Sequence, residues 1–185
     1  CRLFIFFGKY QGEFFKIEHY PDRQKIVLLG LENAGRTTLL HRLKAEQFGD
    51  ASPLASTSRF LSRMVKFDVG GPICRDLIPD VIGVVFMIDS SDHDRIEEAK
   101  SALDTILIDE QLAGAPVVVL ANKADKEGTM NEAEVKERLG LQQMCTGKAA
   151  SCPDQRGRLL EVFSCSVEKK QGYLEALRWL ELCFW

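Results

Sequence analysis

Segments with strand-like and helix-like patterns alternate along the chain from residue 24 onward, and this alternation restricts the fold more than any other feature. Several strand segments are almost continuous apolar runs, which is typical of parallel strands covered by helices on both faces. The pattern predicts an α/β sheet that binds ligands at the carboxyl ends of its strands. The predicted strands are Lys25–Gly30, Met64–Val69, Ile82–Asp89, Pro116–Ala121 and Leu159–Ser164.

Four helices are predicted beside these strands. The second has apolar residues at three- and four-residue spacing, which indicates one buried face, and capping residues stand just before it. The predicted helices cover residues 37–48, 94–112, 131–139 and 172–184. The buried face of the second helix would consist of Ile96, Ala99, Leu103 and Ile106, and its cap would come from Ser90, Ser91 or Asp92.

Composition excludes several classes of protein. The formal net charge of −3 gives no basic surface, so we expect no nucleic-acid partner. Six scattered cysteines without a C-x-x-C pair argue against a zinc site or a disulfide framework and favour a reducing, cytoplasmic location. The chain starts at Cys1 and not at Met, so we expect a fragment or a processed form.

An aromatic-rich N-terminal segment, residues 1–23, precedes the predicted domain at residues 24–185. Leu3, Phe7 and Tyr10 would share one face of a helix, although Gly8 weakens helix formation. Two interpretations stay open for this segment. It either packs on the domain's own core or forms an amphipathic helix that contacts a partner or a membrane surface peripherally.

The stretch "GLENAGRTT" follows the first predicted strand and is one residue away from the phosphate-binding pattern G-x-x-x-x-G-K-[ST], because Arg36 takes the lysine position. Glycines that lead a strand into a helix present backbone N–H groups and a positive dipole end to phosphate. The alternative is an ordinary strand–helix turn with Arg36 directed to solvent. The predicted phosphate-binding residues are Gly30, Leu31, Glu32, Asn33, Ala34, Gly35, Arg36, Thr37 and Thr38, with the Thr37 hydroxyl also a ligand for Mg²⁺.

Three further loops, each after a predicted strand, support a nucleotide site. In "FDVGG", Asp68 is placed to bind Mg²⁺ and the Gly71 N–H to meet a γ-phosphate. In "ANKAD", the Asp125 carboxylate would accept hydrogen bonds from two guanine donors that adenine lacks. Lys123 would lie along the base, and Asn122 would link two loops. The last loop would direct a backbone N–H at guanine O6 from among Cys165, Ser166 and Val167.

These ordered loops make the chain resemble the ADP-ribosylation-factor-like branch of the small GTPases from Gln24 to Trp185. "GLENAG", "DVGG", "IDSSDHDRIEEAK" and "VLANKADKEG" are similar to that branch's motifs, and residues 120–141 look most like the ciliary ADP-ribosylation factor-like protein 13 subgroup. The resemblance implies a P-loop, Ras-like, mostly parallel sheet. It also implies binding of GTP or GDP with Mg²⁺, protein effectors or regulators, and a role in membrane trafficking.

Departures from the family pattern gather in the segments that sense the γ-phosphate. Pro72 stands where the family commonly has a glutamine that orients the attacking water. "STSRF" keeps Thr57 as an expected Mg²⁺ ligand but puts Arg59 at a glycine position. The segment between the two switches and the second switch itself are both shorter than in the family. The base-reading loops are therefore intact, while the phosphate end is altered.

Three functions remain open from the sequence. The first is a GTP-binding regulator with little hydrolysis of its own. The second is a pseudo-GTPase that acts as a binding scaffold with or without nucleotide. The third is a competent GTPase whose missing glutamine is supplied by a partner.

Overall fold

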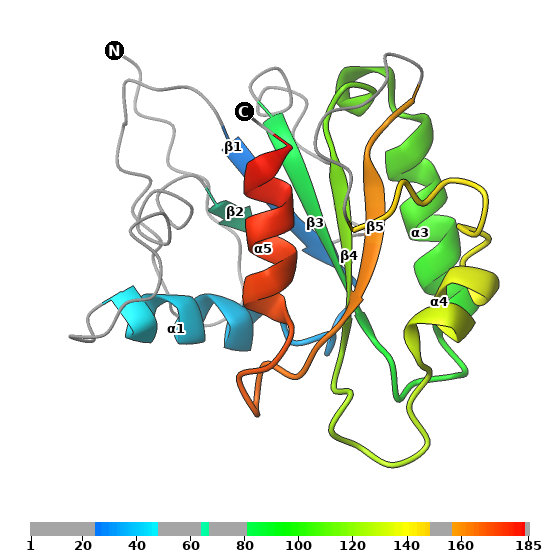
Figure 1. Cartoon of the computed structure of the whole chain (residues 1–185). Coiled ribbons are helices and arrows are strands. Elements are labelled where there is room, and N and C mark those ends of the chain that lie inside the picture. Colours follow the sequence, from blue (N-terminus) through cyan, green and yellow to red (C-terminus); the bar gives the residue numbers. More distant parts are fainter. Residues whose placement is uncertain (1–24, 48–63, 67–80, 149–156, 184–185) are drawn as a thin grey trace, which may run out of the picture.

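The computed structural model describes residues 25–47, 64–66, 81–148 and 157–183, which form an α/β domain (Figure 1). The strands are β1 (Lys25–Gly30), β2 (Met64–Lys66), β3 (Val81–Asp89), β4 (Val117–Asn122) and β5 (Leu160–Ser164). The helices are α1 (Arg36–Gln47), α3 (Ile96–Ile108), α4 (Glu132–Arg138) and α5 (Tyr173–Leu182), with a short 3₁₀ turn at Glu110–Leu112.

The five strands form one sheet in the order β2-β1-β3-β4-β5, and every neighbouring pair is parallel. This confirms the Ras-like α/β fold that the sequence implied. Because β2 lies on one side of β1 and β3 on the other, the chain changes direction across the sheet at β1. In sheets of this order, ligands bind where the loops after these two central strands separate.

The apolar core has two layers, one on each face of the sheet. Alternate residues of a strand point to opposite faces, so Phe86 packs with α3 and α4, whereas Val85 packs with α1 and α5. Figure 1 shows α1 and α5 on one side of the sheet and α3 and α4 on the other. Among the described residues, no helix is both long enough and apolar enough to cross a membrane.

Most predicted elements agree with the structure apart from small shifts at their ends, but the helix predicted at 94–112 ends at Ile108, because Asp109 has an extended backbone and a separate 3₁₀ turn follows at Glu110–Leu112. The buried face of α3 is confirmed, since Ile96, Ala99, Leu103 and Ile106 are all almost fully buried. Capping of α3 differs from the prediction: its N-cap is Arg95, which makes no side-chain cap bond. Asp92 accepts the backbone N–H of Arg95 at 3.2 Å instead, and the two serines bond to other groups.

Some predictions lie outside the described residues. They are the N-terminal segment 1–23, the end of the strand predicted at Met64–Val69, and the two segments expected to be shorter than in the family. The division into an extension and a domain at residues 24–185 therefore stays a prediction.

A buried ion pair joins α4 to the edge strand β5. The Glu161 side chain is 1% exposed, and its Oε1 lies 2.5 Å from Lys136 Nζ. The backbone N–H groups of Gly147 and Val162 also donate to this carboxylate. Burial would raise the pKa of Glu161, but the hydrogen bonds from Lys136 and the backbone hold the pKa below its ordinary value.

Replacing Lys136 by methionine should strongly destabilise the domain, because it leaves Glu161 charged and buried without its ammonium partner. We expect a loss of about 3 kcal/mol in the free energy of unfolding at pH 7, measured by urea denaturation. A carboxyl group whose pKa is lower in the folded protein than in the unfolded chain stabilises the fold at pH values above the unfolded pKa. This contribution is lost as the pH falls through the folded pKa. The difference between wild type and Lys136→Met should therefore shrink as the pH falls through the pKa of Glu161.

The matched control is Glu98→Gln, which breaks an exposed ion pair with Arg95 and should leave the unfolding midpoint unchanged. A Lys136→Met variant within about 0.5 kcal/mol of wild type would contradict the importance of the buried pair.

Candidate functional site

The loop between β1 and α1 has positive φ angles at three positions, which few residue types other than glycine and asparagine adopt readily. Gly30, Asn33 and Gly35 have φ values of 143°, 65° and 99°. A side chain at Gly30 would run into the backbone of Met87, and one at Gly35 would run into the amide of Asn122. Glycine fits these positions because it has no Cβ, and asparagine tolerates the left-handed region better than most residues. The loop thus passes closely over the central strands before α1 begins.

Helix α1 begins at Arg36, the residue that replaces the expected lysine. The residue is only 6% exposed, so Arg36 does not point to solvent, whereas phosphate binding by this loop stays a prediction. Thr37 and Thr38 are exposed at the start of the helix, next to exposed Glu32 and Asn33. The N–H groups of a helix's first turn precede its internal hydrogen-bond ladder and carry the positive end of its dipole, which suits an anion.

Asn122, the last residue of β4, connects this loop with the loop after β5. Its Nδ2 donates to the Ala34 carbonyl at 2.8 Å, and its Oδ1 accepts the Val167 N–H at 3.1 Å. The residue is 4% exposed, so these bonds are shielded from water. The predicted linking role of Asn122 is therefore confirmed by hydrogen bonds.

Lys123 follows Asn122 in a left-handed conformation, with a φ of 67°. Its Nζ lies 2.5 Å from Asp89 Oδ2, at the carboxyl end of the neighbouring strand β3. Asp89 also accepts hydrogen bonds from the N–H and the hydroxyl of Ser91. Burial would raise the pKa of Asp89, but these bonds from Lys123 and Ser91 hold the pKa below its ordinary value.

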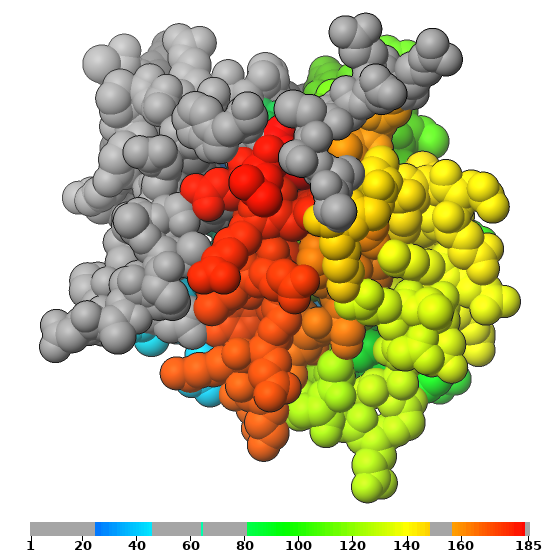
Figure 2. All heavy atoms as spheres, in the orientation of Figure 1, coloured from blue at the N-terminus to red at the C-terminus, as the bar shows by residue number. Residues whose placement is uncertain are grey.

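Asp125 is exposed, and its Oδ1 accepts a 2.5 Å hydrogen bond from the Ser166 hydroxyl. This bond is the main reason that the pKa of Asp125 is lowered, so its carboxylate is ionised at neutral pH. Figure 2 shows the loops after β4 (light green) and after β5 (orange) next to each other at the lower end of the molecule. An ionised, solvent-facing acceptor therefore lies where these two loops meet.

The backbone of the loop after β5 changes one detail of the sequence prediction. The N–H groups of Cys165 and Ser166 donate to the carbonyls of Ala121 and Gln171, and that of Val167 donates to Asn122. All three predicted donors thus bond within the protein. The next N–H in this loop is that of exposed Glu168, and it bonds to no acceptor among the residues that the structure describes.

Comparison of the sequence with those of known proteins shows the family to which the chain belongs. Residues 12–183 match the model of the ADP-ribosylation factor family. The chain belongs to the ADP-ribosylation factor family of small GTPases.

Relatives in this family align over most of both chains. The small COPII coat GTPase SAR1 of Giardia intestinalis is 35% identical over 171 residues, which cover 87% of this chain and 90% of the relative. ADP-ribosylation factor-like protein 1 of Drosophila melanogaster is 34% identical, with 84% and 86% covered. ADP-ribosylation factor 1 of Brassica rapa subsp. pekinensis is also 34% identical, with 84% and 85% covered.

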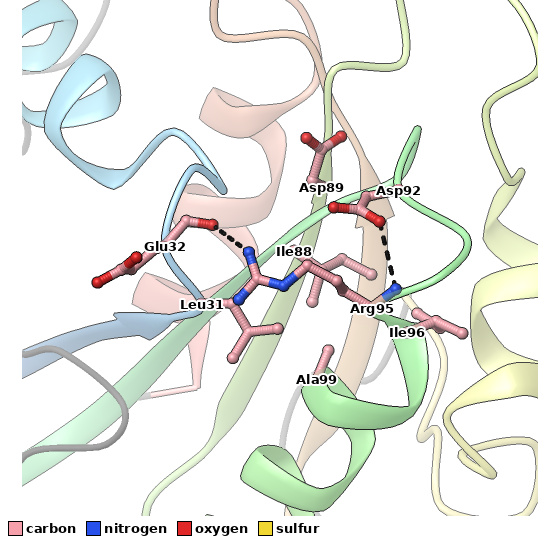
Figure 3. A pocket seen from close by; sticks show the side chains of 8 residues that line it. All are labelled: Leu31, Glu32, Ile88, Asp89, Asp92, Arg95, Ile96 and Ala99. Carbon is pink, nitrogen blue, oxygen red and sulfur yellow. Dashed lines mark hydrogen bonds between the residues drawn. The ribbon is translucent and has the colours of Figure 1, made fainter.

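A shallow hollow lies between the β1–α1 loop and the start of α3 (Figure 3). Arg95 crosses it, and its guanidinium donates to the Glu32 carbonyl at 3.3 Å. Asp89 and Asp92 also line this hollow. The sequence motifs gave Asp89 and Arg95 no role at the site, because their contacts with Lys123 and with the Glu32 carbonyl join segments far apart in the sequence.

Five positions that the sequence singled out in the loops of this site lie outside the described residues: Thr57, Arg59, Asp68, Gly71 and Pro72. The structure therefore brings together the phosphate-loop residues, Asn122, Lys123, Asp125 and the loop after β5. The Mg²⁺ ligands Thr57 and Asp68 and the γ-phosphate contact of Gly71 stay predictions.

Proposed function

We propose that this member of the ADP-ribosylation factor family is a guanine-nucleotide-binding regulator with impaired GTP hydrolysis. The observation that carries the proposal is the pair of hydrogen bonds from Asn122, which hold the β1–α1 loop against the loop after β5. The two ends of a nucleotide need different chemistry, one for phosphate and one for base. Asn122 fixes the relative position of the loops that supply both.

The phosphate end would be held by the β1–α1 loop and the start of α1. The glycines let this backbone pack directly against Met87 and Asn122, and the left-handed conformation of Asn33 is of the kind in which successive N–H groups form an anion-binding concavity. Buried Arg36 would add positive charge at the same place. Its planar guanidinium is larger than an ammonium, so we expect a poorer fit between β- and γ-phosphate oxygens than a lysine provides.

The base end would be read by Asp125 and Glu168. The ionised Asp125 carboxylate would accept from guanine N1–H and the exocyclic amine, neither of which adenine presents in that arrangement. The Glu168 N–H would donate to guanine O6 in place of the three residues first expected. Together they give a donor–acceptor pattern that guanine matches.

Magnesium would be held by oxygen ligands at the phosphate end of the site. Exposed Thr37 offers a hydroxyl at the first turn of α1, and Thr57 and Asp68 are the further predicted ligands. When bound, Mg²⁺ would neutralise phosphate charge.

The regulatory part of the proposal follows from the family, whose members bind guanine nucleotides and effectors or regulators. A trafficking role, peripheral membrane contact through residues 1–23 and a cytoplasmic location are proposals of the same kind. Placement in the ciliary subgroup rests only on the resemblance of residues 120–141 and stays a prediction.

Guanine selectivity is the first test. We expect GDP to bind about 100-fold or more tightly than ADP, because adenine would not offer the Asp125 carboxylate the two donors that guanine offers. Titration of fluorescent GDP and ADP measures the ratio, and equal affinities would refute the proposal. Asp125→Asn should move the preference toward xanthine nucleotides. Asp104→Asn, which changes an exposed carboxylate on α3, should leave the ratio unchanged.

Intrinsic hydrolysis should be very slow, since proline at position 72 neither orients water nor stabilises charge. In a single-turnover assay we expect a rate well below about 3 × 10⁻⁴ s⁻¹, the intrinsic rate of Ras. Pro72→Gln alone should not restore a normal rate, because the shorter segments around it would misplace the glutamine. Hydrolysis as fast as in an ordinary small GTPase would show that the impairment is absent.

Arg36→Lys should strengthen GTP binding more than GDP binding, because a lysine regains the contact with γ-phosphate oxygens. Arg36→Ala should weaken binding of both nucleotides. Isothermal titration calorimetry measures these changes, with Arg42→Lys on the same helix as a control that should change neither. If neither Arg36 variant alters either affinity, Arg36 is not at a phosphate site and the scaffold function becomes the better account.

A further inference from the structure

Asp89, at the end of β3, contacts the nucleotide site through Lys123, and the sequence motifs give it no role. We propose that Asp89 is a positioning residue that holds the Lys123 side chain against the face of a bound guanine base. The proposal rests on the guanine-nucleotide binding proposed above, and it concerns a residue outside all four motif loops.

Lysine needs such a partner to contribute to binding. Its four-carbon stem is flexible, and fixing it costs conformational entropy of up to about 2 kcal/mol. The ion pair with Asp89 restrains the stem before any nucleotide arrives: both side chains are mostly buried, with 19% of Lys123 and 11% of Asp89 exposed. A restrained stem presents a flat apolar surface to the base at a lower entropic cost.

Asp89 is itself held rigidly by its surroundings. It lies opposite Asn122 in the β3–β4 register, so the carboxylate and the lysine backbone are positioned by one pair of strands. Ser91 donates to its Oδ1 through both the N–H, at 3.0 Å, and the hydroxyl, at 2.6 Å. Ser90 donates to the Asn122 carbonyl through its N–H and its hydroxyl, which fixes the peptide that precedes Lys123.

Electrostatics favour the same interpretation. A carboxylate near a loop built to bind phosphate would repel the ligand, so an unpaired Asp89 would weaken binding. The Lys123 ammonium at 2.5 Å neutralises it. Arg95 also contributes positive charge to the hollow that Asp89 lines, and its guanidinium bonds to Glu98 and to the Glu32 carbonyl. The ion pair between Asp89 and Lys123 therefore allows a carboxylate to lie beside a site that binds a negatively charged ligand.

The test compares binding of GDP and inosine diphosphate to four forms of the full chain: wild type, Asp89→Asn, Lys123→Ala and the double variant. Asp89→Asn should weaken both nucleotides by about tenfold, the loss expected for a hydrogen bond to a charged group. The ratio of the two affinities should not change, because lysine contacts the plane of the base and not the amine that inosine lacks. In the Lys123→Ala background, Asp89→Asn should cause no further loss, and it should recover some binding because it removes a carboxylate that no longer has its ammonium partner.

A purely structural role would give a different result, namely a lower thermal midpoint and an equal loss in both backgrounds. Asp94→Asn, which removes an exposed carboxylate from the same loop, should bind both nucleotides like wild type. If Asp89→Asn does not fold, Ser91→Ala is the second variant. It keeps both charges but removes one hydrogen bond from Asp89, and it should weaken GDP about threefold only when Lys123 is present.

The outcomes separate the two proposals. Unchanged affinities in Asp89→Asn, or losses that persist without Lys123, would overturn the positioning role while leaving guanine-nucleotide binding intact. A wild-type chain that binds neither nucleotide would overturn both.

Discussion

The buried side chain of Asn122 is the interaction on which the site depends. Its amide bonds to the Ala34 carbonyl on one side and to the Val167 N–H on the other, at the carboxyl end of a central strand. Because the side-chain amide has one acceptor oxygen and one donor nitrogen, a single residue can bond to a carbonyl in one loop and to an N–H in the other. Loss of this side chain would leave a buried carbonyl and a buried N–H without partners, which costs more than the bonds themselves gained.

Around Asn122 the site divides into a base end and a phosphate end of different character. The base end is built in detail: Ser166 donates a hydrogen bond to Asp125, Asp89 pairs with Lys123, and the β3–β4 register places Asp89 opposite Asn122. The phosphate end keeps the backbone geometry of a phosphate loop but carries a buried arginine in place of lysine. A protein of this kind would retain nucleotide recognition while its response to the γ-phosphate is changed.

The sequence predicted most of the fold because local patterns determine its elements. The β1 segment was predicted with its observed ends, and the buried face of α3 was predicted residue by residue. Strand order was not predictable in this way, since no local pattern shows that β3 lies between β1 and β4. The cap of α3 was predicted incorrectly because the hydroxyls of Ser90 and Ser91 donate to the Asn122 carbonyl and to the Asp89 carboxylate, and not to the helix.

The sequence predicted those site residues that belong to a short motif with fixed spacing. Asn122, Lys123 and Asp125 could be found because their spacing is fixed within one loop. The roles proposed here for Asp89 and the Glu168 N–H could not, because they depend on contacts between loops and on which backbone donors are already used within the chain. Such information exists only once the loops are placed together.

The nucleotide that remains bound through purification tests the central claim most directly. The full chain would be purified without added nucleotide and denatured, and the released small molecules would be identified by chromatography and mass spectrometry. The account predicts guanine nucleotide in nearly equimolar amount, because a site with prepositioned base and phosphate loops should release its ligand slowly. Recovery of a protein free of nucleotide that also fails to take up added GDP, or recovery of adenine nucleotide, would contradict it.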